Sequence, residues 1–136
     1  MELIEGLAPY AKSTHIKDMG VRPYADGFLL SEVPLGTGIL DLPRIVSVIQ
    51  KANPKTKFSL EMITRDPLKV PCLTKQYWEV FPGRNGRYLA QTIRLVNAKA
   101  SRDPLPVVDQ LSREDRAKAE EDNVKACIRY VNEKLQ

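Results

Sequence analysis

The only histidine of the sequence lies in a short stretch whose side chains are suited to acid-base or metal chemistry. Residues 13–18 read Ser-Thr-His-Ile-Lys-Asp, so that Lys17 and Asp18 follow closely on His15. The pattern predicts a buried strand that ends in a cluster of polar groups. A hydrogen-bonded structural role is the ordinary one for a lone histidine, so His15 by itself predicts no site.

The second chemically suited residue is Glu61, a carboxylate within the apolar run Phe58-Ser59-Leu60-Glu61-Met62. Burial of a carboxylate is costly unless the group is paired or binds a cation, which favours a functional role for Glu61. Imidazole and carboxylate together suit Mn²⁺, Zn²⁺, Co²⁺ or Mg²⁺ in varying degree. His15 and Glu61 therefore predict part of a divalent-metal site.

Further charged residues are candidates for the same site. Glu32, within Ser31-Glu32-Val33-Pro34-Leu35-Gly36-Thr37-Gly38, is a candidate third metal ligand, and an exposed loop acid is the alternative. The glycines beside it do not form a phosphate loop, because neither Lys-Ser nor Lys-Thr follows them. Arg22 and Arg65, expected in the loops after the two strands, join Lys17 and Asp18 as candidate substrate-binding residues, with a solvated surface position as the alternative.

A strand, a helix and a second strand must position these residues. Asp41 is a good N-cap for the helix, and Asn53-Pro54 ends it. One helix between two strands implies a parallel pair joined by a right-handed crossover. The two strands then end at the same edge, where His15 and Glu61 are expected to meet. We call this edge the mouth of the site, and Lys17 or Asp18 is expected to be turned into it.

The remaining elements follow from apolar spacing and from the positions of glycine and proline. Residues 18–40 are expected to form a long connection rich in glycine and proline, broken only by Phe28-Leu29-Leu30. The other expectations, in chain order, are the tail of a helix over 1–11, a strand over 57–63, a short aromatic helix over 76–81, a helix over 87–100, an extended connector over 101–111, and a final helix that Ser112 opens.

Composition excludes several classes of function. The chain has 136 residues and a net charge of +4, but its basic residues are scattered and form no stripe interleaved with aromatic residues, which argues against a nucleic-acid partner. Cys72 and Cys127 fit neither a disulfide framework nor a zinc motif. The acidic start is unlike a signal peptide, and no apolar run is long enough for a membrane span, so a cytoplasmic protein without membrane contact is expected.

Three stretches together resemble a known family. His15-Ile16-Lys17-Asp18, then residues 33–41 with their Pro-Leu-Gly-x-Gly pattern, then Leu60-Glu61-Met62 look like the last two β/α units of the xylose isomerase-like TIM barrels. This is the sugar phosphate isomerase/epimerase superfamily, which also includes the apurinic endonuclease branch. Residues 64–69 and 120–123 are similar to members of the superfamily as well, so the resemblance covers nearly the whole chain.

The resemblance implies an α/β fold: the C-terminal portion of a (β/α)₈ TIM barrel over residues 1–100, followed by a connector and helix over 101–136 that pack on the barrel or on a partner. It also implies a divalent metal (Mn, Mg, Co or Zn) held by Glu, Asp, His and Glu on successive strands. His15 matches the third ligand and Glu61 the fourth. Glu61 also matches one of two glutamates that exchange the proton next to a sugar carbonyl through an enediolate.

The first glutamate, which is the other proton-transfer group, and the aspartate have no counterpart here, since few residues precede the His15 strand and a full barrel takes about 250 residues. The chain alone is therefore expected to bind metal weakly, to be inactive, and to associate with another chain or with the missing N-terminal part. Two alternatives stay open. One is a non-catalytic oligomerisation or interaction module, and the other is an apurinic endonuclease-like phosphodiesterase, which needs several histidines where this sequence has one.

Overall fold

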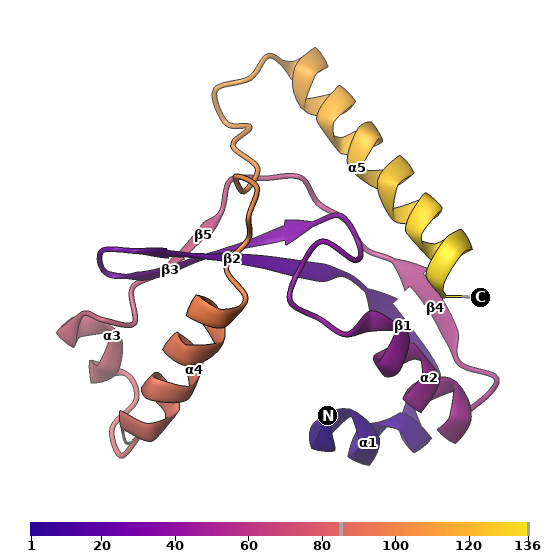
Figure 1. The fold of residues 1–136 in the computed structure, drawn as a ribbon, viewed down its shortest axis with the longest axis horizontal. Helices are drawn as coiled ribbons and strands as arrows, with labels where there is room; N and C mark the ends of the chain where they lie inside the picture. The colour runs from indigo at the N-terminus through magenta and orange to yellow at the C-terminus, as the bar shows by residue number, and fades with distance from the viewer. Residues whose placement is uncertain (85, 136) are drawn as a thin grey trace.

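A computed structural model describes residues 1–84 and 86–135 and has a mixed α/β fold (Figure 1). The strands are β1 (Ser13–Ile16), β2 (Asp18–Tyr24), β3 (Gly27–Val33), β4 (Lys57–Leu60) and β5 (Leu68–Val70). The helices are α1 (Glu2–Leu7), the 3-10 turn η1 (Ala8–Tyr10), α2 (Leu42–Ala52), α3 (Lys75–Glu79), α4 (Gly86–Ala98) and α5 (Arg113–Lys134).

The expected parallel pair is present. Strands β1 and β4 lie side by side in parallel, with His15 opposite Ser59 and Ile16 opposite Leu60. The connection between them runs through β2, β3 and then α2, at whose start Asp41 accepts a hydrogen bond from the backbone N–H of Arg44. The second strand is shorter than predicted and ends at Leu60, although the N–H of Glu61 still donates to the carbonyl of Ile16 at 2.9 Å.

The prediction of a long connection over residues 18–40 was wrong for residues 18–33, whereas residues 34–40 do form a loop. Residues 18–33 form a β-hairpin, β2 and β3, which continues through β5 into a three-stranded antiparallel sheet. The glycines and prolines that suggested a loop have places in this sheet. Pro23 lies on β2, which is an edge strand where no ladder hydrogen bond is required from it. Gly27 has φ of 154° directly after the two-residue turn.

A close approach accounts for a further glycine of the hairpin. A Cβ built on Gly20 would lie 2.7 Å from a side-chain carbon of Leu105, because the connector after α4 crosses β2 at this point. The N–H of Ser101 donates to the carbonyl of Val21 at 2.8 Å, which fastens the connector to the outer edge of the hairpin. A sequence rule that treats glycine as loop therefore fails here for a packing reason.

The core joins the parallel pair to the helices on either side of it. Its buried members come from β1, α2, α5 and the loops that follow β3 and β4: Ile16, Leu35, Leu42, Val46, Met62 and Cys127. Of the predicted apolar face of α5, Cys127 is fully buried and Val124, Val131 and Leu135 pack against the core, whereas Ile128 is half exposed. Helix α5 thus packs on its own chain.

Most of the later elements agree with their predictions. The aromatic helix α3, the helix α4, the extended connector and the helix capped by Ser112 are all found. Helix α4 buries Val96 alone, so its predicted core stripe is only partly used. The strands of residues 1–84 and 86–135 form two open sheets rather than a barrel, and none of the described helices combines the length and the apolar character needed to cross a membrane.

Candidate functional site

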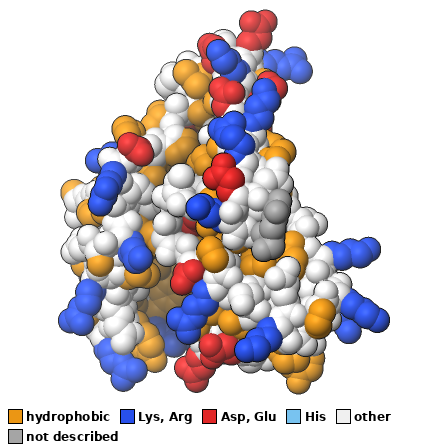
Figure 2. Space-filling model, turned by 45° about the vertical axis from the view of Figure 1, so that its right-hand side comes forward, with side chains coloured by type: hydrophobic (Ala, Val, Ile, Leu, Met, Phe, Trp, Pro, Cys, Tyr) orange, Lys and Arg blue, Asp and Glu red, His pale blue; other side chains and the backbone are white. Residues whose placement is uncertain are grey.

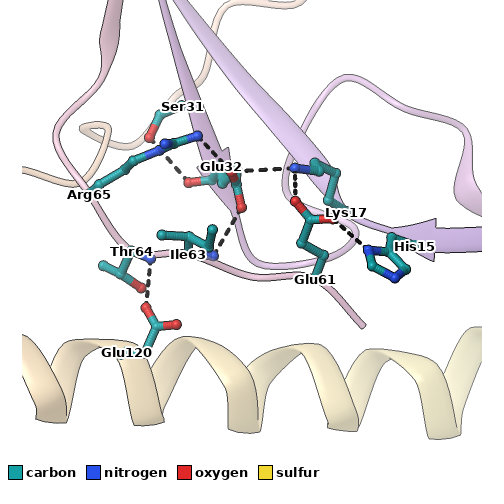
Figure 3. A network of polar contacts seen from close by, with 9 residues as sticks. All are labelled: His15, Lys17, Ser31, Glu32, Glu61, Ile63, Thr64, Arg65 and Glu120. Carbon is teal, nitrogen blue, oxygen red and sulfur yellow. Dashed lines mark hydrogen bonds and ion pairs between the residues drawn. The ribbon is translucent and has the colours of Figure 1, made fainter. Parts of the chain in front are cut away.

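His15 and Glu61 lie in contact at the carboxyl end of the parallel pair (Figure 3). His15 Nδ1 lies 3.0 Å from Glu61 Oε2, and the two side chains come from β1 and from the residue after β4. The prediction that they converge at one edge is confirmed. Both reach solvent, since 69% of the His15 side chain and 30% of the Glu61 side chain are exposed. The prediction that these strands are buried was wrong, because most residues of β1 and β4 are exposed or partly exposed.

Lys17 is turned into the same mouth. Its ammonium donates to the second carboxylate oxygen of Glu61, Oε1, and lies 3.5 Å from Oε1 of Glu32. The hydrogen bond to Glu61 is the main reason that the pKa of Lys17 is raised, with burial opposing it and Glu32 assisting. The same hydrogen bond, together with that from His15, lowers the pKa of Glu61 below its ordinary value. Glu61 is therefore an ionised carboxylate at neutral pH.

Glu32 is a buried residue of β3, with 2% of its side chain exposed, so the alternative of an exposed loop acid was wrong. Its Oε2 accepts the backbone N–H of Ile63 at 2.9 Å, and its Oε1 accepts from Arg65 Nη2 at 3.0 Å and lies near Lys17. A buried carboxylate needs such partners to offset its desolvation. Glu32 ties the hairpin to the loop after β4 through these contacts, which are drawn in Figure 3.

Asp18 does not face the mouth. Its side chain is 1% exposed, and its two oxygens accept the backbone N–H groups of Met19, Gly36, Gly38 and Leu40 at distances from 2.8 to 3.2 Å. Asp18 is therefore a structural residue that holds the Pro-Leu-Gly-x-Gly loop, and its predicted substrate contact is not supported. The loop needs glycine at position 38 because a Cβ there would lie 2.2 Å from Asp18 Oδ1.

The two candidate arginines are separated. Arg65 joins the network through Glu32 while 64% of its side chain stays exposed, so it reaches solvent beside the mouth. Arg22 lies further along the hairpin, where it is exposed and pairs in register with Leu29, three pairs away from the Met19 and Glu32 pair. At roughly 3.4 Å per residue this separation is about 10 Å along the strand. Arg22 is not brought to the site.

One part of the network was not singled out as functional from the sequence. The N–H of Thr64 donates to Glu120 Oε2 at 2.6 Å, and the Asn123 amide donates to Thr64 Oγ1 at 2.8 Å. Helix α5 thus fastens the loop between Ile63 and Arg65, both of which bear on Glu32. The i and i+3 spacing of Glu120 and Asn123 on one helix face is the signal that could have indicated a shared contact.

The contact between His15 Nδ1 and Glu61 Oε2 at 3.0 Å is an ordinary hydrogen bond. An imidazole nitrogen and a carboxylate oxygen are both atom types that bind divalent metals. Glu32, the further candidate ligand, is not grouped with them, because its two oxygens contact the N–H of Ile63 and the side chains of Arg65 and Lys17. Within residues 1–84 and 86–135, no three His, Cys, Asp or Glu side chains cluster closely enough to hold a metal.

Figure 2 shows acidic and basic side chains interspersed over the face of the molecule that it presents. No broad single-sign patch is drawn on that face, in agreement with the scattered basic residues of the sequence. Comparison with protein-family models, with curated proteins and with solved structures found no match to this chain.

Proposed function

We propose that the mouth formed by His15 and Glu61 is part of a metal-assisted proton-transfer site that acts next to the carbonyl of a sugar or sugar phosphate. The observation that supports this proposal is the meeting of an imidazole and an ionised carboxylate, 3.0 Å apart and open to solvent, at the carboxyl end of a parallel strand pair. Active groups of parallel β/α proteins gather at this end.

Each side chain has a distinct role in the proposal. His15 and Glu61 Oε2 would hold a divalent cation such as Mn²⁺ or Co²⁺, which when bound polarises the carbonyl and hydroxyl of the open-chain sugar. Glu61 would also take the proton from the carbon next to the carbonyl, leaving an enediolate, and the second proton-transfer group would deliver a proton to the other face of that carbon. Arg65, which is largely exposed beside the mouth, would bind a hydroxyl or phosphate of the substrate.

The proposal includes additional strands that complete the site, in the manner of the barrel that the sequence resembles. Among the described residues β1 pairs only with β4, so each strand has an unpaired outer edge. These unpaired edges favour a further strand beside the pair. That element would bring the remaining ligands and the second proton-transfer group.

The metal part of the proposal is tested on the purified chain. Because His15 is the only histidine, its imidazole gives a single set of ring signals, and Mn²⁺ should broaden them at lower concentration than any signal of α3 or α4. Glu61→Gln should weaken this effect, whereas Glu133→Gln, an exposed carboxylate near the end of α5, should not. His15 signals that are no more sensitive to Mn²⁺ than those of the rest of the surface would refute the metal site.

The proton-transfer part is tested once the remaining strands are supplied, from a second polypeptide or as one longer chain. Glu61→Gln keeps a neutral oxygen but cannot take the proton, so turnover of a ketose or its phosphate should fall by at least about 10²-fold. His15→Ala should act chiefly through metal affinity and should recover in part with excess metal. A Glu61→Gln protein with near-normal turnover would assign the proton transfer to another residue.

A non-catalytic interaction module is the second candidate function. The unpaired edges of the β1 and β4 pair favour it as much as they favour a completed enzyme, because an edge strand offers its backbone groups to any extended partner. The two functions differ in what the mouth does. An interaction module would keep its partner when both His15 and Glu61 are replaced, whereas the enzyme would lose turnover.

A further inference from the structure

Lys17 holds a place at the mouth that neither a metal ligand nor a surface lysine explains. Its ammonium contacts the Glu61 oxygen that His15 does not use, so the two oxygens of one carboxylate are divided between an imidazole and an ammonium (Figure 3). Only 34% of the Lys17 side chain is exposed. A lysine left to solvation would extend into water, as such flexible stems ordinarily do.

The position of the Lys17 ammonium is itself restricted by the buried carboxylate of Glu32. Glu32 lies 3.5 Å from the ammonium, and the Glu32 carboxylate is held by the N–H of Ile63 and by Arg65. The chain of contacts therefore runs from a buried carboxylate through an ammonium to an exposed carboxylate and ends at the imidazole. Hydrogen bonds and ion pairs made to a ligand or a proton-transfer group by its neighbours fix the orientation of that group.

We propose that Lys17 is a positioning residue, which fixes the Glu61 carboxylate so that Oε2 faces His15, and that Glu32 is the anchor that fixes Lys17. This inference rests on the proposed function for its purpose, but the geometry it describes exists without metal or substrate. An exposed glutamate has several rotamers open to it, and the ammonium restricts that freedom in advance of binding. The residue is thus assigned to orientation rather than to ligation or to substrate contact.

The positive charge of Lys17 opposes binding of a cation at the mouth. Its positive charge lies one carboxylate away from the proposed cation and repels it. Removal of the charge should therefore tighten binding of a divalent ion, on the order of tenfold at the high dielectric of an exposed site, while the orientation of Glu61 is lost. Loss of the charge alone tightens binding of the ion, so the orientation of Glu61 is the quantity that identifies the positioning role.

The orientation is measured first, without metal, from the ring nitrogens of His15. A hydrogen bond from Nδ1–H to Glu61 fixes one tautomer of the neutral imidazole, which ¹⁵N shifts report at about pH 8.5, where an ordinary imidazole is neutral. In Lys17→Met the Nδ1–H tautomer should lose population, in Lys17→Arg it should be largely restored, and in Glu32→Gln it should fall partway. Lys57→Met is the matched control, since it removes the same charge from the opposite end of β4 and should leave the tautomer unchanged.

Titration with Mn²⁺ is the second measurement on the same variants. Lys17→Met should bind the ion more tightly than the wild type, and Lys57→Met should bind it nearly as the wild type does. A folded Lys17→Met chain with the wild-type tautomer would overturn the positioning role, and Lys17→Gln repeats the test if the methionine variant does not fold. If no variant binds Mn²⁺ at His15 while the tautomer responds as expected, the proposed function fails and the positioning role stands.

Discussion

Replacement of Asp18 by asparagine should destabilise the fold more than any comparable change on the surface. The carboxylate lies at the junction of β1 and β2, and its oxygens accept four backbone N–H groups. Oδ2 takes those of Gly36 and Gly38 at 3.0 and 2.9 Å, and Oδ1 takes those of Met19 and Leu40 at 2.8 and 3.2 Å. An asparagine has one oxygen, so its NH₂ group must face two N–H donors whichever way the amide is turned.

The expected destabilisation is set by the hydrogen bonds that the amide cannot make. Two hydrogen bonds to a charged acceptor disappear, at about 1.5 kcal/mol each, so Asp18→Asn should lower the free energy of unfolding by about 3 kcal/mol. Domains of this kind are stable by roughly 5–15 kcal/mol in total, so the decrease is a large share. For a chain of 136 residues it corresponds to a fall of roughly 10 °C in the unfolding midpoint.

Urea unfolding followed by circular dichroism measures this decrease, with Asp103→Asn as the control. Asp103 is an exposed carboxylate of the connector, and its replacement should change the free energy of unfolding by less than about 0.5 kcal/mol. Since Asp18 adjoins Lys17, the same variant should also disturb the His15 tautomer. An Asp18→Asn chain within about 1 kcal/mol of the wild type would refute the assignment of Asp18 to the loop, because the N–H groups would then have other acceptors.

Two further predictions concern glycine and cysteine. Gly36 has φ of 84°, and a Cβ on it would lie 2.1 Å from the Tyr130 ring, so Gly36→Ala should lower the free energy of unfolding by at least about 2 kcal/mol. Gly6 has open space around it, so Gly6→Ala should be neutral or stabilising by up to about 1 kcal/mol. Equal effects of the two substitutions in urea unfolding would contradict this prediction. Burial raises the pKa of the Cys72 and Cys127 thiols, so both should resist a thiol reagent in the native state. The raised pKa favours the folded state fully at pH values below an ordinary thiol pKa, and the free energy of unfolding should decline as pH rises above about 9. Fast labelling of the native chain at about pH 8 would show that the thiols are accessible.

The convergence of His15 and Glu61 could be predicted because it depends on topology alone. Strands β1 and β4 lie side by side in parallel, and parallel neighbours end at the same edge of a sheet even though the connection between them holds the β2–β3 hairpin as well as α2. The caps of α2 and α5 were predictable for a similar reason, since Asp41 and Ser112 act on N–H groups within three residues of themselves.

The partners of the charged residues were not predictable in the same way. Asp18 and Lys17 are adjacent, yet one is buried under a loop and the other reaches into the mouth, because successive side chains of an extended chain point to opposite faces. To apply that alternation, the hairpin must first be known. Residues 18–33 contain three glycines or prolines at strand positions, and Gly20 among them is explained only by distant residues such as Ser101 and Leu105.

Glu32 shows what the hairpin adds to the chemistry. As a loop acid it would be a free ligand, but as a buried residue of β3 it must be neutralised, and the two cations that do so are then drawn toward the mouth. One of them, Lys17, sets the orientation of Glu61, and the other, Arg65, stays exposed where a substrate anion could reach it. The buried carboxylate therefore shapes the site without entering it. Its removal should free Arg65 and leave Lys17 held by Glu61 alone.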